Sequence, residues 1–248
     1  MKTKKLIQVI LGGLFISLAL ISCKKDKDTT PVDQLAPGAV LTSSLSGLGS
    51  HGGQPSGTPY ILPSNIKIIG SMYGGYPGSG KAVFNSPKTI GNIQQYLALM
   101  PKTEYTEYGY GTYVPVYMRL HNTSYSIYNL IIPAGLILCD SIPNDTIPGD
   151  TTQSGFIIAP LKITIPAGGT VDVCVQSFCM NTNFPAPYGN KYMFKVVTNN
   201  DQLYRVITIL QDKKSLADHI NDIQDILWEI TNGSGLTQAD IDMMNSWQ

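Results

Sequence analysis

The chain has 248 residues, of which 43% are hydrophobic, so it is long enough for one or two domains with a buried core. Charged residues make up only 14%, and the formal net charge is zero. No basic patch stands out, which argues against a nucleic-acid partner. With 16 Pro, 24 Gly and 14 Tyr, the composition favours a turn-rich, β-rich exported protein.

The N-terminal residues 1–22 predict a lipoprotein signal peptide. Three lysines among the first five residues precede an apolar run, Leu6–Ile21, that is short for a membrane span. The tetrapeptide Leu20-Ile21-Ser22-Cys23 resembles the lipobox of bacterial lipoproteins. This resemblance implies cleavage after Ser22 and a lipid on Cys23 that attaches the protein to the cell envelope. The charged tract Lys24–Asp28 is similar to the export tract of some outer-surface lipoproteins, which favours the outer membrane. An uncleaved anchor or an ordinary secretory peptide is the alternative.

The remaining chain divides by composition into three parts. Residues 23–59 follow the lipobox and are rich in Thr, Ser, Gly and Pro, which predicts a flexible tether. Residues 60–198 contain short β-favouring runs, and residues 199–248 show helical spacing of apolar residues. We therefore expect a β domain at 60–198 with a helical region packed on it.

The β part predicts an antiparallel β-sandwich, because its short runs are separated by Gly and Pro turns. In Thr170–Phe178, the valines at 171, 173 and 175 share one face of an expected strand. A short helix is an alternative between Thr89 and Met100. The other expected strands are Ile66–Ile69, Val114–Leu120, Tyr125–Ile132, Leu136–Cys139, Ile157–Ile165 and Tyr192–Val197.

The C-terminal part predicts two or three helices. Leu203, Val206, Ile207 and Leu210 are spaced for one helix face, although a strand is also compatible with Val206–Ile209. A second helix is expected to start at Ser215 and to stop at Asn232-Gly233, and a third to start at Thr237.

The cysteines beyond the lipobox are Cys139, Cys174 and Cys179. Thiols of exported proteins tend to pair, and three is an odd number. A Cys139–Cys174 disulfide would leave Cys179 over, whereas Cys139 could also pair with Cys179. A spare thiol in an oxidising compartment requires an explanation.

Gln224 gives the spare thiol a potential partner. In a helix, Gln224 lies beside Ile223 at the edge of the buried face, and Trp228 follows one turn later on the same side. An internal thioester needs such a setting, because water must be kept from the acyl carbon while a thiolate attacks the side-chain amide. We therefore expect Cys179 and Gln224 as bond partners and Trp228 as their shield.

Both segments also resemble a known family. Phe178-Cys179-Met180-Asn181 is similar to the cysteine motif of bacterial surface thioester domains, namely an aromatic residue, Cys, an aliphatic residue, then Asp or Asn. Ile223-Gln224 with Leu227-Trp228 is similar to the glutamine motif of that family. The resemblance implies a covalent adhesin whose thioester captures a nucleophile, such as an amine, on a host or cell-surface protein. Asp225 departs from the small or apolar residue of the family, and a lipid replaces its usual cell-wall attachment.

Other functions remain open. Cys179 is alternatively a buried apolar residue or a disulfide partner, with Gln224 a polar residue at the helix edge and Trp228 part of the core. The protein would then be a non-covalent binding or structural module, and its Gly-interrupted tyrosine run, Tyr105–Tyr113, could stack on a glycan.

An enzyme is not expected. A cysteine hydrolase would need a base beside Cys179, and His219 is the nearest candidate in the sequence. The phosphate-loop-like segment Gly75–Ala82 lacks the hydroxyl that follows the lysine, so no nucleotide is expected. The histidines have no ligand-spaced partners, and we expect neither metal nor cofactor.

Overall fold

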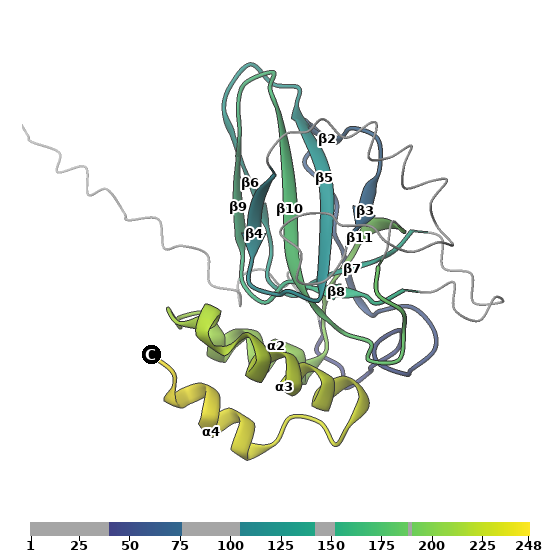
Figure 1. Ribbon diagram of the computed structural model, residues 1–248, viewed down its shortest axis with the longest axis vertical. Coiled ribbons are helices and arrows are strands. Elements are labelled where there is room, and N and C mark those ends of the chain that lie inside the picture. Colours follow the sequence, from purple (N-terminus) through teal and green to yellow (C-terminus); the bar gives the residue numbers. More distant parts are fainter. Residues whose placement is uncertain (1–39, 76–104, 142–151, 188–189) are drawn as a thin grey trace, which may run out of the picture.

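The computed structural model describes residues 40–75, 105–141, 152–187 and 190–248. It is mainly β, and three C-terminal helices lie together at one end of the strands (Figure 1). The signal peptide, Cys23 and the alternative helix at 89–100 lie outside the described residues. Over the described ranges, no helix has the length and apolar character needed to cross a membrane.

Nine strands form one sheet, and its pairings close into a ring. β10 pairs with β5 along most of its length and with β8 at its end, and the strands between them complete the circuit in the order β5-β3-β11-β7-β8-β10. β4 lies on the outer edge of β10 and runs parallel to it, which departs from the expected antiparallel pattern. The nine strands are β1 (Gly57–Pro59), β2 (Ile66–Ile68), β3 (Met72–Gly74), β4 (Thr106–Gly109), β5 (Val114–Asn122), β7 (Leu136–Asp140), β8 (Gly155–Phe156), β10 (Thr170–Cys179) and β11 (Lys191–Thr198).

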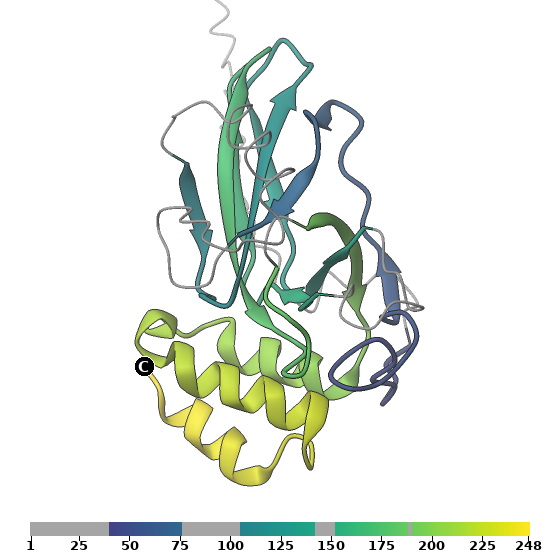
Figure 2. The same ribbon diagram turned by 45° about the vertical axis from the view of Figure 1, so that its right-hand side comes forward.

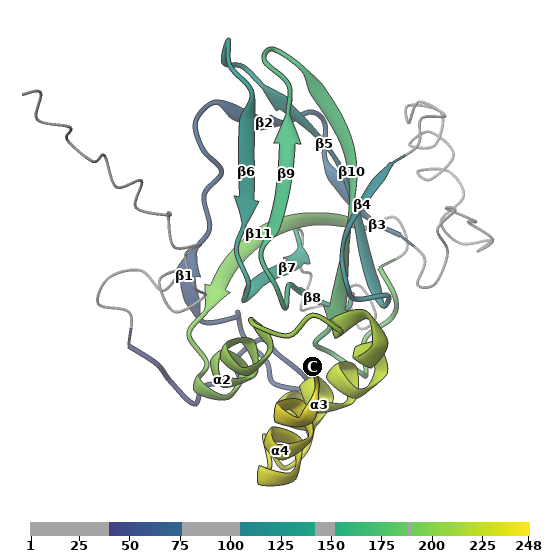
Figure 3. The ribbon, with the colours of Figure 1, turned by 90° about the vertical axis from the view of Figure 1, so that its left-hand side faces the viewer.

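Two further strands form a separate ribbon. β6 (Tyr128–Ile132) pairs antiparallel with β9 (Leu161–Ile165), and the two run side by side in Figure 3. Their alternating buried residues, such as Leu130 and Ile163, share a core with Val173 and Val175 of β10. The shared face predicted for the valines of β10 is confirmed, because Val173 and Val175 are buried in this core and Val171 packs against it.

The helices form a second core against the ends of the strands. α2 (Asp201–Leu210) buries the four residues that the helical spacing predicted, so the alternative of a strand is wrong. Asn200 caps α2, since its side chain accepts hydrogen bonds from the Gln202 and Leu203 N–H groups. α4 (Gln238–Ser246) begins after Thr237 as expected, and Thr237 and Asp240 form a capping box there. Figure 2 shows the three helices together below the strands, with the yellow α4 farthest from them.

α3 (Ile220–Asn232) ends at Gly233 as expected but begins later than predicted. Ser215 precedes a short 3-10 helix, η2 (Leu216–His219), and its side chain makes no capping hydrogen bond there. The apolar residues of α3 contact both the other helices and the strand ends. The buried ones are Ile223, Ile226, Leu227 and Ile230.

Residues 40–59 are part of the fold, so the predicted tether does not extend to residue 59. Leu48 is a core residue with 2% exposure, and β1 pairs with β11. Thr42 forms a parallel bridge with Asn200 at the start of α2. In Figures 1 and 2 this purple segment loops beside the helices. We call residues 45–52 the strap. The sequence did not indicate that the strap packs on the fold, because the strap contains few large apolar residues. Its packing depends on the backbone of its glycines and on the Leu48 side chain.

Candidate functional site

Cys179 is the last residue of β10, at the point where the strand meets the helices. One side of this strand end is occupied by β8, where Cys179 is opposite Gly155 and the Met180 N–H donates to the Ser154 carbonyl at 3.0 Å. Consecutive residues of a strand direct their backbone polar groups to opposite sides. The N–H and C=O of Cys179 therefore point away from β8, to the side of β5 and just past Ser177, the last residue of β10 that pairs with β5.

The side-chain amide of Gln224 fills this position. The Cys179 N–H donates to Gln224 Oε1 at 2.8 Å, and Gln224 Nε2 donates to the Cys179 carbonyl at 2.7 Å. The amide thus pairs with both backbone groups of one residue, as a neighbouring strand would. Both side chains have 0% exposure. The expected juxtaposition of Cys179 with Gln224 is present, across 45 residues of sequence.

The Cys179 sulfur lies over the following turn. The Asn181 N–H donates to this sulfur at 3.4 Å, and the thiol lies 3.4 Å from the Asn181 carbonyl oxygen. Burial raises the pKa of the Cys179 thiol, and the contacts with the Asn181 backbone and the Trp228 indole partly oppose that rise. The thiol is accordingly neutral at rest.

Trp228 covers the pair from the next turn of α3. It packs on the core cluster that contains Cys179, and its ring meets Tyr113 edge to face with centroids 5.4 Å apart. Sequence analysis assigned the shielding to Trp228 alone and missed Tyr113 as its second member.

Tyr113 reaches Trp228 because the segment after β4 crosses close over β10. A Cβ on Gly111 would lie 2.1 Å from the Ser177 carbonyl carbon, so only glycine fits this crossing. The tyrosine run therefore packs on the sheet. Tyr105, at its start, packs on Tyr117 of β5 with centroids 4.9 Å apart.

The strap holds the turn after Cys179 from the other side. The Gly49 N–H donates to the Met180 carbonyl at 2.8 Å, and Asn181 Nδ2 donates to the Gly49 carbonyl at 3.0 Å. Asn181 Oδ1 also accepts from the Ser154 N–H at 2.9 Å. The buried Asn181 side chain thus links the residue before β8 to the strap. It thereby fixes the turn whose backbone contacts the Cys179 sulfur. The sequence motif contained Asn181, but nothing in its spacing indicated these partners.

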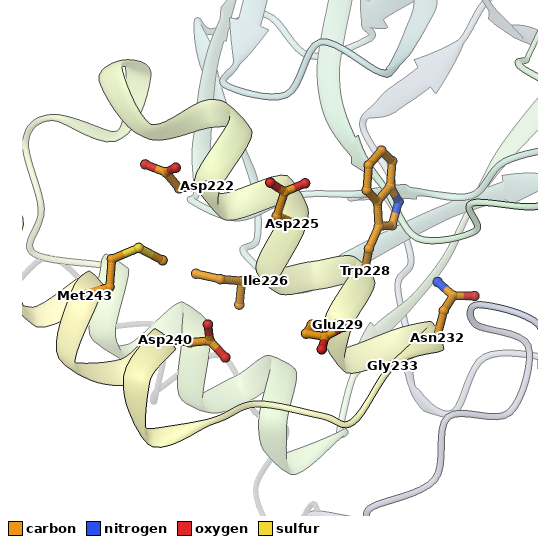
Figure 4. Close-up of a pocket in the computed structure, with 9 residues that line it drawn as sticks. All are labelled: Asp222, Asp225, Ile226, Trp228, Glu229, Asn232, Gly233, Asp240 and Met243. Atoms are coloured by element: carbon orange, nitrogen blue, oxygen red, sulfur yellow. The ribbon is translucent and has the colours of Figure 1, made fainter.

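A cleft of about 580 Å³ lies between α3 and α4, and Trp228 lines it. Four carboxylates also line it, three from α3 and Asp240 from α4 (Figure 4). The indole of Trp228 is turned toward the strands and away from α4 in this view. The α3 carboxylates belong to Asp222, Asp225 and Glu229.

The considered Cys139–Cys174 disulfide is not formed, and all three described cysteines are free. β7 and β10 are separated by β8, and two strand spacings amount to about 10 Å, which is beyond the reach of a disulfide. The hydroxyl of Ser154 lies 3.7 Å from the Cys139 sulfur. Cys174 instead lies against Tyr117 on β5, which the strand register places opposite it.

These buried thiols predict alkaline destabilisation. Burial raises the pKa of Cys139 from 9.0 to about 11 and that of Cys174 to about 12. A group with a raised folded-state pKa binds more protons in the folded state, so its stabilisation is complete below the unfolded pKa and is lost as pH rises through the folded value. We expect the free energy of unfolding in urea to be constant from pH 7 to 8 and to fall from pH 9 to 11. Cys174→Ala should flatten that fall, and an unchanged slope in this variant would contradict the assignment.

His219 does not serve Cys179. Its ring stacks on Trp247 with centroids 4.1 Å apart, and Nδ1 lies 3.1 Å from the Asp222 carboxylate. No group of three or more metal-ligating side chains occurs within the described ranges. Comparison with known protein families, curated proteins and solved structures found no match.

Proposed function

We propose that this chain is a surface-anchored lipoprotein that attaches covalently to its target through a Cys179–Gln224 internal thioester. The observation that carries the proposal is the double hydrogen bond between the Gln224 amide and the Cys179 backbone, which brings the two residues together in a fully buried setting. A lipid on Cys23 anchors the protein to the outer membrane, and the thioester reacts once without turnover.

The chemistry balances within the chain. The Cys179 sulfur attacks Cδ of Gln224, the C–N bond breaks, and the amide nitrogen leaves as ammonia with the thiol proton. The acyl group then waits behind Trp228 and Tyr113 until a nucleophile reaches it. An amine on a host or cell-surface protein attacks the same carbon and leaves an amide on residue 224 and a free thiol on Cys179.

The fold that we propose for this function is an antiparallel sandwich in which the β6–β9 ribbon packs over β5 and β10. Their shared core supports this arrangement, because Leu130, Ile132 and Ile165 of the ribbon cluster with Val116 and Met118 of β5. β10 would then be held rigidly on its inner face, and Cys179 at its end would keep a fixed position toward α3.

The test is the intact mass of the purified protein before and after methylamine. We expect a mass one ammonia below that of the same mature chain with an unreacted Gln224, followed by the gain of one methylamine on the peptide that contains Gln224. Cys179→Ala should show neither change, with a loss of stability of only about 1–2 kcal/mol for the missing sulfur and its contacts. Cys174→Ala is the matched control, because it removes a free buried thiol outside the site and should leave both changes in place.

A mass equal to that of the unreacted mature chain, or one lighter only by the hydrogens of a disulfide, would contradict the thioester. The protein would then be a non-covalent binding or structural lipoprotein. The cleft between α3 and α4 favours this second candidate, because its carboxylates suit a cationic group of a protein partner better than a neutral glycan.

A further inference from the structure

The indole N–H of Trp228 is a buried donor without a conventional acceptor. Among the described residues it meets no hydrogen-bond partner of ordinary geometry, although most buried donors do. The rest of the ring is well placed, since it packs on Tyr113 and on the core cluster of Cys179. An unsatisfied buried N–H costs about 1–3 kcal/mol. If this side chain only shielded the site, phenylalanine would do so without that cost.

The Cys179 sulfur is the candidate acceptor for this donor. Gln224, one turn before Trp228, is bonded to the Cys179 backbone, which brings the indole to the same strand end. The indole lowers the pKa of the Cys179 thiol against the larger opposite effect of burial. A neutral sulfur is a weak acceptor, whereas a thiolate is a strong one, so the contact strengthens only when charge develops on sulfur.

We propose that the Trp228 indole N–H and the Asn181 backbone N–H together form a pocket for the Cys179 thiolate, and that Trp228 is a hydrogen-bond donor to the leaving group as well as a shield. This inference rests on the proposed thioester. In the capture step, the amine nitrogen attacks Cδ of residue 224, the C–S bond breaks with its electron pair on sulfur, and the two donors hold that charge. The thiolate then takes the proton that the amine loses, which leaves an amide and a thiol.

The same donors act when the thioester forms. The Cys179 thiolate is then the attacking group, and its formation in a buried site would be prohibitive without them. Asn181 supplies its N–H from a turn that its own side chain braces against the strap and β8. The pocket is therefore assembled from one rigid backbone donor and one side-chain donor on the helix that carries Gln224.

The experiment compares Trp228→Phe with replacement of the Trp228 indole by benzothiophene, which keeps the two-ring shape and substitutes sulfur for the N–H. The protein is first treated with methylamine, so Cys179 carries a free thiol whether or not a thioester had formed. The pKa of Cys179 is then measured from the pH dependence of its ¹³Cβ resonance, assigned by its absence in Cys179→Ala. We expect both variants to raise this pKa by about 1, the amount that corresponds to one hydrogen bond to a charged group.

Methylamine capture gives a second measurement. Loss of the donor should slow capture about tenfold in both variants, since a hydrogen bond of about 1.4 kcal/mol to the leaving group disappears. Tyr105→Phe is the control, because its ring packs on Tyr117 of β5 outside the site and its loss of a hydroxyl should change neither value. If Trp228 were a shield alone, the benzothiophene variant would keep the Cys179 pKa and capture rate of the native protein, and the inference would be overturned. A native protein without the ammonia deficit would refute the thioester, while the pKa comparison would still decide whether Trp228 donates to the sulfur.

Discussion

Gln224→Ala should destabilise the protein by about 3–5 kcal/mol, well beyond the cost of removing the cysteine itself. The Gln224 amide is the partner of both backbone polar groups of Cys179, and all of these groups are buried. Truncation leaves an N–H and a C=O without partners in a site too enclosed for free access by water. Equilibrium unfolding in urea measures the difference, and the thioester should be lost in the same variant.

The comparison with Cys179→Ala separates structure from chemistry at this site. Both variants should lack the ammonia deficit and the methylamine adduct, but only the glutamine variant should show the large loss of stability. Asp225→Ala is a matched control on the same helix, because the Asp225 side chain is exposed and should cost less than about 0.5 kcal/mol. If Gln224→Ala proved as mild as this control, the paired hydrogen bonds would have no energetic importance.

Gly49→Ala should cost about 2–5 kcal/mol, although it adds a single methyl group to the strap. Gly49 has φ of +60°, and a Cβ there would lie 1.9 Å from the Thr231 carbonyl oxygen near the end of α3. The strap must therefore move away from the helix. Because Gly49 also bonds Met180 and Asn181, this movement loosens the turn beneath the Cys179 sulfur. We expect lower stability in urea and faster hydrolysis of the thioester, measured as loss of the ammonia deficit with time.

Gly52→Ala provides the control within the same strap. A Cβ on Gly52 would have no atom within 4 Å, so its stability should lie within about 0.5 kcal/mol of the native value. Equal effects of the two alanine variants would mean that the strap is loose, and that the contact between Gly49 and Thr231 does not support the site.

The sequence predicts the parts of this site that depend on local periodicity. Alternation of apolar residues places Cys179 at the end of a strand, and the spacing in α3 places Gln224 and Trp228 on one side of a helix. Longer strands such as β5, β7 and β11 were predicted because each contains a sustained β-favouring run. The mainly β fold with C-terminal helices is confirmed on the same basis.

The missed features depend on backbone contacts between distant segments. β1, β3 and β4 have three or four residues each, too few to show a period, and their pairing is decided by β11, β5 and β10. The strap packs through glycine backbone, so its composition resembles that of a linker. Tyr113 is aligned by the close crossing at Gly111, which no residue pattern indicates. The double hydrogen bond of Gln224 also depends on which way the Cys179 backbone points.

The parallel bridge between Thr42 and Asn200 has a mechanical consequence. The Thr42 N–H donates to the Asn199 carbonyl and the Asp201 N–H donates to the Thr42 carbonyl, each at 2.9 Å. In a protein anchored upstream of residue 40 and bonded to its target at Gln224, tension enters at this bridge and passes to the strap before it reaches the sheet. Between residue 40 and Gln224 the chain has a contour length of roughly 600 Å, which unfolding would release as extension. The amide at residue 224 would survive that unfolding. Unfolding of the domain would therefore dissipate mechanical load while the covalent bond to the target stays intact.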